Sequence, residues 1–96
     1  MNNQPYAEIH IDRFNQDHFL RVFSNDIKEE ELVWHRDKQD RLVSVVKGEG
    51  WKLQMDNELP EELVRGKTYI IKKMDYHRII KGQGELILDI EEKQEW

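Results

Sequence analysis

Apolar residues in this chain come in short runs that alternate with polar positions, and glycine, asparagine, aspartate and proline separate the runs. Residues 6–11 and 85–91 show the alternation clearly, whereas the spacing typical of amphipathic helices is nearly absent. Successive side chains on a strand point to opposite faces, so Leu86, Leu88 and Ile90 are expected to share a buried face. The pattern therefore predicts an all-β protein.

The predicted strands are evenly spaced, which favours a small β-barrel or jelly roll. A first strand over residues 6–11 and a turn at 15–18 lead into a second strand at 19–23. Further strands are expected at residues 32–35, 42–47, 51–56, 68–72, 76–81 and 85–91, and residues 61–65 are expected to form a short strand or a single turn. Two glycine-rich segments, Gly48-Glu49-Gly50 and Gly82-Gln83-Gly84, are expected to be hairpin turns. Residues 92–96, charged except for Trp96, are expected to fray.

Length and charge narrow the choice of function classes. The chain has 96 residues and no cysteine, and 20 acidic residues against 15 Lys and Arg give it a net charge of -5. We expect one domain over residues 1–96, with neither disulfides nor a cysteine-ligated metal. Its dispersed basic residues do not favour nucleic acid, and no apolar run is long enough to span a membrane. Residues 1–14 lack the pattern of a signal peptide, so we expect a cytoplasmic protein.

Two histidine-centred segments echo each other. Trp34-His35-Arg36 and Tyr76-His77-Arg78 each place a histidine between an aromatic residue and an arginine, and a Gly-X-Gly segment follows each of them downstream. The distances to these glycines differ, so this is not a tandem repeat of the solenoid type. It predicts two histidine-bearing strands.

The first of these segments resembles the first motif of the cupin superfamily, in particular that of its small single-domain members. Gly48 stands at the closing glycine of that motif. Counting back, Arg41 takes the position of the glutamate, Asp37 that of the second histidine and His35 that of the first. Glu29 replaces the opening glycine.

The second cupin motif is matched by Gly66 and His77 at the correct separation. Its proline, glycine and asparagine are replaced by Lys72, Met74 and Lys81. The resemblance covers residues 31–91, with residues 1–18 as an N-terminal strand and turn and 92–96 as a tail. It implies a small barrel, usually dimeric, that holds a divalent metal, commonly iron, manganese, nickel or zinc, with side chains from different strands.

The residues kept at the ligand positions make a coherent set. Two imidazoles and a carboxylate, from His35, Asp37 and His77, are ligand types that bind first-row divalent metals and leave coordination positions open. His35 and Asp37 would share one face of a strand. Arg41 would share it too if the strand continues to residue 41, and its guanidinium would repel a cation unless Asp37 pairs with it.

Three interpretations of this pocket stay open. His35, Asp37 and His77 could form a degenerate metal triad. Alternatively, the metal is lost, and Arg41 with the two histidines accepts an anion such as a carboxylate, phosphate or sugar acid. Finally, the histidines could be interior polar residues with satisfied hydrogen bonds.

The expected function is small-molecule binding at the mouth of the barrel, and the sequence does not name a reaction. In an enzyme a bound metal would act as a Lewis acid, with Arg41 steering the substrate's negative charge. A non-catalytic binding or interaction protein would use the same pocket without turnover. Trp34 and Trp51 are candidates for the pocket wall, although tryptophan in a small barrel is more often a core residue. Exposed edge strands favour a homodimer.

Overall fold

The computed structural model describes residues 6–12 and 15–93 and contains eight strands and one short 3₁₀ helix in those ranges. The strands are β1 (Tyr6–Asp12), β2 (Asn15–Phe23), β3 (Asp40–Glu49), β4 (Lys52–Met55), β5 (Glu61–Glu62), β6 (Thr68–Ile71), β7 (His77–Ile80) and β8 (Gln83–Lys93). The helix, η1, spans Glu29–Glu31. None of the described helical residues forms a segment long and apolar enough to cross a membrane.

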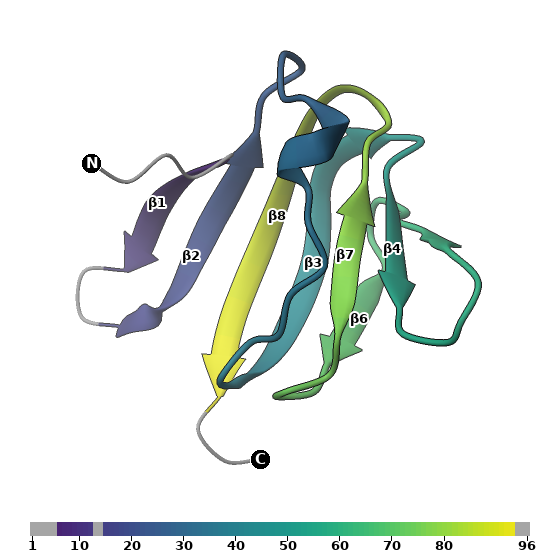
Figure 1. The fold of residues 1–96 in the computed structure, drawn as a ribbon. Helices are drawn as coiled ribbons and strands as arrows, with labels where there is room; N and C mark the ends of the chain where they lie inside the picture. Colours follow the sequence, from purple (N-terminus) through teal and green to yellow (C-terminus); the bar gives the residue numbers. More distant parts are fainter. Residues whose placement is uncertain (1–5, 13–14, 94–96) are drawn as a thin grey trace.

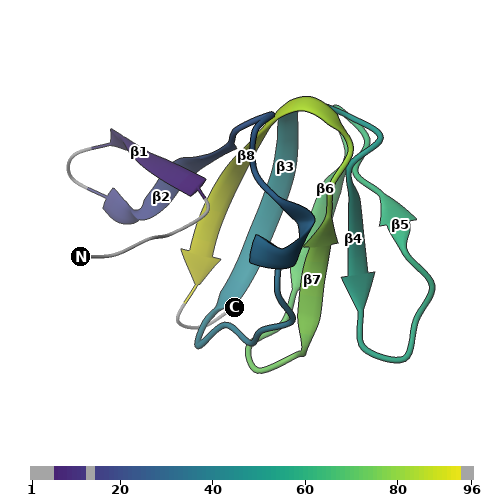
Figure 2. The same cartoon turned by 45° about the horizontal axis from the view of Figure 1, so that its top comes forward.

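The strands pair into two antiparallel sheets (Figures 1 and 2). The larger sheet has the order β1-β2-β8-β3-β6, and the smaller has the order β5-β4-β7. The chain passes repeatedly from one sheet to the other, because β4, β5 and β7 alternate along the sequence with strands of the larger sheet. This arrangement confirms the predicted all-β class and small barrel or jelly-roll architecture.

The core lies between the two sheets and follows from strand alternation. In β8, the central strand of the larger sheet, Leu86, Leu88 and Ile90 have exposed fractions of 0%, 3% and 2%, as predicted, whereas the residues between them are half-buried. One continuous cluster of buried side chains joins both sheets: Phe19, Phe23, Ile27, Val43, Val45, Trp51, Leu53, Leu63, Tyr69, Ile71, Leu86, Leu88 and Ile90.

The two glycine-rich segments are not hairpin turns. Gly50 connects β3 to β4, and Gly82 precedes β8 after β7, so each segment carries the chain between sheets rather than between paired neighbours. The two corners pack against each other: a Cβ atom placed on Gly82 would lie 2.3 Å from the backbone nitrogen of Trp51 and 2.4 Å from the carbonyl oxygen of Glu49. The glycines turn the chain as predicted, but long-range pairing decides which strands they connect.

Three local predictions are also wrong. Residues 15–18 belong to β2 and pair with β1 and β8 instead of forming a turn. Residues 32–35 form no strand apart from one isolated bridge at His35. Glu92 and Lys93 do not fray, because they extend β8 alongside Arg41 and Asp40 of β3. Residues 94–96, including Trp96, lie outside the described ranges.

Candidate functional site

The two histidine-centred segments meet as an antiparallel bridge. The backbone nitrogen of His35 donates to the carbonyl oxygen of His77 at 2.9 Å, and the reciprocal hydrogen bond measures 3.0 Å. The pairing ties the segment that follows η1 to the first residue of β7 and brings the ring centroids within 4.4 Å of each other. Residues far apart in sequence thus contribute adjacent imidazoles.

The neighbours of the two histidines form a stack of two aromatic rings with a guanidinium group at each end. The ring of Trp34 stacks on that of Tyr76 at 5.5 Å. The guanidinium of Arg36 lies 4.7 Å from the Tyr76 ring, and that of Arg78 lies 4.9 Å from the Trp34 ring. The repeated aromatic-His-Arg pattern therefore has a structural meaning, because the stack links the two segments that carry the histidines.

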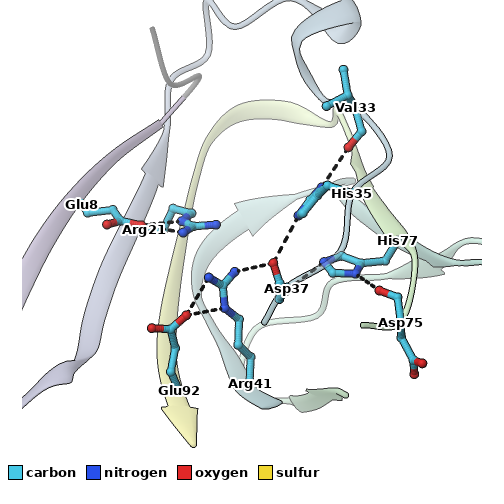
Figure 3. Close-up of polar contacts among 9 residues, drawn as sticks. All are labelled: Glu8, Arg21, Val33, His35, Asp37, Arg41, Asp75, His77 and Glu92. Carbon is cyan, nitrogen blue, oxygen red and sulfur yellow. Dashed lines mark hydrogen bonds and ion pairs between the residues drawn. The ribbon is translucent and has the colours of Figure 1, made fainter. Parts of the chain in front are cut away.

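Hydrogen bonds to the backbone fix the orientation of both imidazoles. Nδ1 of His35 lies 2.9 Å from the carbonyl oxygen of Val33, and Nδ1 of His77 lies 2.7 Å from that of Asp75 (Figure 3). A carbonyl oxygen accepts only, so each Nδ1 carries the hydrogen and donates it. In the neutral ring Nε2 then has a free lone pair, and in both residues Nε2 is the nitrogen nearest to Asp37.

Asp37 is the buried centre of the group. Its Oδ2 lies 3.2 Å from Nε2 of His77, and its Oδ1 lies 3.7 Å from Nε2 of His35. A neutral His77 cannot donate from Nε2, and Oδ2 accepts no hydrogen bond although it is fully buried. Burial by itself would raise the pKa of Asp37, but the contact with His77 and the positive charge of Arg41 outweigh it and hold the pKa below its usual value.

Arg41 is neutralised by two carboxylates. Its Nη1 lies 3.1 Å from Oδ1 of Asp37, and its Nε and Nη2 donate to Oε2 of Glu92 at 2.9 and 2.7 Å. Glu92 is the cross-strand partner of Arg41 in the pairing of β3 with β8. With neutral histidines, the group of Asp37, Arg41 and Glu92 carries one net negative charge, which favours a cation.

Glu92 is a member of this group that the sequence pattern did not predict. Residue 92 is predicted to belong to a fraying tail because it lies near the charged end of the chain. Only the register of β8 against β3 places it beside Arg41. Nothing local to residues 91–93 distinguishes this carboxylate from the other glutamates of the chain. Its role therefore depends on tertiary structure.

A cavity of about 270 Å³ adjoins the group and is lined by His35, Asp37, Arg41 and His77 together with apolar side chains from both sheets. Its volume is slightly below the usual range of small-molecule pockets, which suits a small ligand. Trp34 and Trp51 are not among its lining residues. Trp51 is fully buried in the core, where its indole nitrogen donates to the carbonyl oxygen of Gln83, and Trp34 belongs to the stack described above.

The predicted ligand residues lie close enough together to hold a metal ion. One ligand atom from each of His35, Asp37 and His77 can be chosen so that all three lie within 4.8 Å of one another. The histidines offer lone pairs from rings whose other nitrogen is held by a backbone carbonyl, the usual outer contact of a metal-bound histidine. The buried, unpartnered Oδ2 completes a donor set that fits a divalent ion.

Comparison with solved structures identifies the fold. A mannose-6-phosphate isomerase-like protein of Ralstonia eutropha JMP134 superposes with a TM-score of 0.71 at 16% identity, covering 94% of this chain and 83% of that one. A cupin domain of Bordetella pertussis Tohama I gives 0.61 at 19% identity, with coverages of 97% and 98%. A cupin-2 domain-containing protein of Shewanella frigidimarina NCIMB 400 gives 0.62 at 23% identity, with coverages of 96% and 85%.

Sequence comparison adds nothing to this likeness, because no family model and no curated protein matches the chain. The solved structures resemble it along nearly its whole length, and those that are named for a domain are named for cupin domains. The chain is a small protein with the cupin fold.

Proposed function

We propose that this barrel binds a divalent first-row metal ion and, beside it, a small molecule in the adjoining cavity. The ligands would be Nε2 of His35, Nε2 of His77 and a carboxylate oxygen of Asp37. The observation that carries the proposal is the buried Oδ2 of Asp37, which has no hydrogen bond and lies 3.2 Å from Nε2 of His77, the ring nitrogen that carries no hydrogen in the neutral histidine. A cation between these atoms would satisfy all of them.

The state of Arg41 favours this function over an anion site built on Arg41. Its contacts with Asp37 and Glu92 engage Nε, Nη1 and Nη2. An anion would have to compete with two carboxylates that are already in place. A cation instead gains from the excess negative charge of the group.

The chain's own residues would shape the chemistry. Three protein ligands would leave coordination positions open, and a metal there would supply Lewis-acid polarisation of a bound oxygen. Arg41 holds one oxygen of Asp37 at 3.1 Å and so fixes the carboxylate plane. Apolar residues of the cavity wall, such as Ile79 and Leu88, exclude water from the ligand.

Metal analysis of protein purified without chelators or a metal-binding tag tests the proposal. We expect stoichiometric metal, and uptake of Mn²⁺ or Zn²⁺ by the metal-stripped protein in calorimetry. His77→Ala should abolish uptake, because it removes a ligand. His18→Ala is the matched control, since His18 pairs with Asp89 and does not line the cavity. If the wild-type protein contains no metal and takes up none, or if both variants bind equally, the proposal fails.

A further inference from the structure

Arg21 is an arginine at an inward-facing position of the barrel. In β2 the buried residues alternate, and Arg21 stands between the core residues Phe19 and Phe23 with an exposed fraction of 8%. It lines the same cavity as His35 and Asp37. Figure 3 shows its guanidinium extending from β2 toward the side on which these residues lie. An arginine is seldom buried to this degree without a partner.

The partners of Arg21 use only part of its donor set. Nε and Nη2 both donate to a single oxygen, Oε2 of Glu8, at 3.1 and 2.5 Å, and the ring of Tyr6 lies 3.8 Å from its Cζ. Nη1 has no acceptor among the described residues. It is also not fully buried, because within those residues Oδ2 of Asp37 is the one fully buried side-chain atom without a hydrogen bond. Nη1 therefore has hydrogens to donate into accessible space.

The charges around the cavity determine what it can accept. The inward-facing charges and their direct partners are Arg21, Arg41, Glu8, Asp37 and Glu92. With neutral histidines these five sum to one negative charge, which disfavours an anion. A bound divalent cation changes the sum to one positive charge, which suits a monoanion. Glu31 also lines the cavity, but it is exposed and its charge is more strongly screened by solvent.

We propose that the cavity binds a small monocarboxylic acid with an apolar body, that Nη1 of Arg21 donates to its carboxylate, and that binding depends on a divalent ion at the histidines. This inference rests on the proposed function, because the ion supplies the charge. The cavity's volume of about 270 Å³ and largely aliphatic wall fit a short hydrocarbon body. Arg21 is then the residue that selects for the acid, because all three nitrogens of Arg41 already contact Asp37 or Glu92.

Calorimetry on the Mn²⁺-loaded protein with hexanoate and hexanamide tests this assignment. The two probes share a shape and differ in charge, so their affinity ratio reports the carboxylate contact. We expect hexanoate to bind about tenfold to hundredfold more tightly than hexanamide, as for a hydrogen bond to a charged group. In Arg21→Met the two should bind alike, while the variant still takes up Mn²⁺, because Arg21 is not one of the proposed metal ligands.

Glu8→Gln should have the opposite effect to Arg21→Met on hexanoate binding. It removes the charge that competes for the guanidinium, and Glu8 lies on an edge strand, where the substitution leaves the core intact. It should therefore tighten hexanoate binding. If Mn²⁺ binds but hexanoate is not preferred, or the preference survives in Arg21→Met, or hexanoate binds equally without Mn²⁺, this inference is wrong and the metal site stands. If wild-type protein takes up no Mn²⁺, the proposed function itself fails.

Discussion

Asp37 is a single carboxylate with a guanidinium at one oxygen and a histidine nitrogen at the other. Arg41 approaches Oδ1 at 3.1 Å and His77 approaches Oδ2 at 3.2 Å. Burial raises the pKa of Asp37, but these partners lower it further than burial raises it. The residue is therefore ionised at neutral pH despite its burial, which is the state a metal ligand requires.

Glu92 controls how strongly Arg41 opposes a cation at Asp37. In Glu92→Gln the side chain can still accept from Arg41, but its negative charge is gone, so the group loses its net negative charge. The Coulomb energy between a unit charge at this range and a divalent ion is on the order of 2 kcal/mol or more. We expect Mn²⁺ affinity in calorimetry to fall by about tenfold or more.

The control for this prediction is Glu91→Gln. Glu91 is adjacent in β8 but lies on its other face, where it pairs with Lys93. The Glu91→Gln substitution should leave Mn²⁺ affinity unchanged. An equal loss in both variants would mean that overall charge, not the neutralisation of Arg41, determines metal affinity.

At the scale of elements, the barrel is closed by corners where the chain changes sheets. The β3–β4 corner at Gly50 and the β7–β8 corner at Gly82 meet so closely that there is no room for a side chain on Gly82. Gly84, two residues later, has a left-handed backbone with φ of 69° but open space around its Cα. The two glycines are thus required for different reasons, close approach in one and backbone conformation in the other.

Gly82→Ala and Gly84→Ala should accordingly differ in stability. The Cβ of Gly84→Ala meets nothing, so its cost is that of a left-handed non-glycine residue, about 1–2 kcal/mol. Gly82→Ala forces two backbone segments apart and should cost about 3 kcal/mol or more. Urea unfolding followed by tryptophan fluorescence measures both, since Trp51 lies at the corner. Equal costs would contradict the packing of the two corners.

At the scale of the whole molecule, the larger sheet has an apolar patch on its outer face. Ile9 of the edge strand β1 has an exposed fraction of 54%, and its cross-strand partner Leu20 is half-buried. Val22 and Ile87, also partners across strands, continue this face. An edge strand with unpaired backbone groups beside apolar side chains favours association with another copy.

We therefore expect a homodimer that uses this outer face. Sedimentation at micromolar concentration should give a dimer, and Ile9→Lys should shift it to monomer by placing a charge in the apolar contact. Ile70→Lys is a matched control, because Ile70 is 60% exposed on β6 at the opposite edge of the sheet. A monomer across the concentration range, or dissociation by both variants, would exclude this interface.

The sequence by itself determined the all-β class, most of the strand positions and the buried face of β8, because the alternation of apolar and polar residues is a local consequence of strand geometry. It also indicated His35, Asp37 and His77 as a possible group through the spacing of two motifs. These properties need no knowledge of which strands pair. The structure then brings the three residues together around an unpartnered carboxylate oxygen.

Only the tertiary structure decided that the glycine-rich segments join different sheets, that Glu92 neutralises Arg41 and that Arg21 reaches into the same cavity as the histidines. Turn residues dictate a change of direction but not the partner that follows it. Charged residues likewise give no local sign of the residue they will meet 51 positions away, as Arg41 meets Glu92. Such contacts arise from the register between strands distant in sequence, which the packing of the whole core sets.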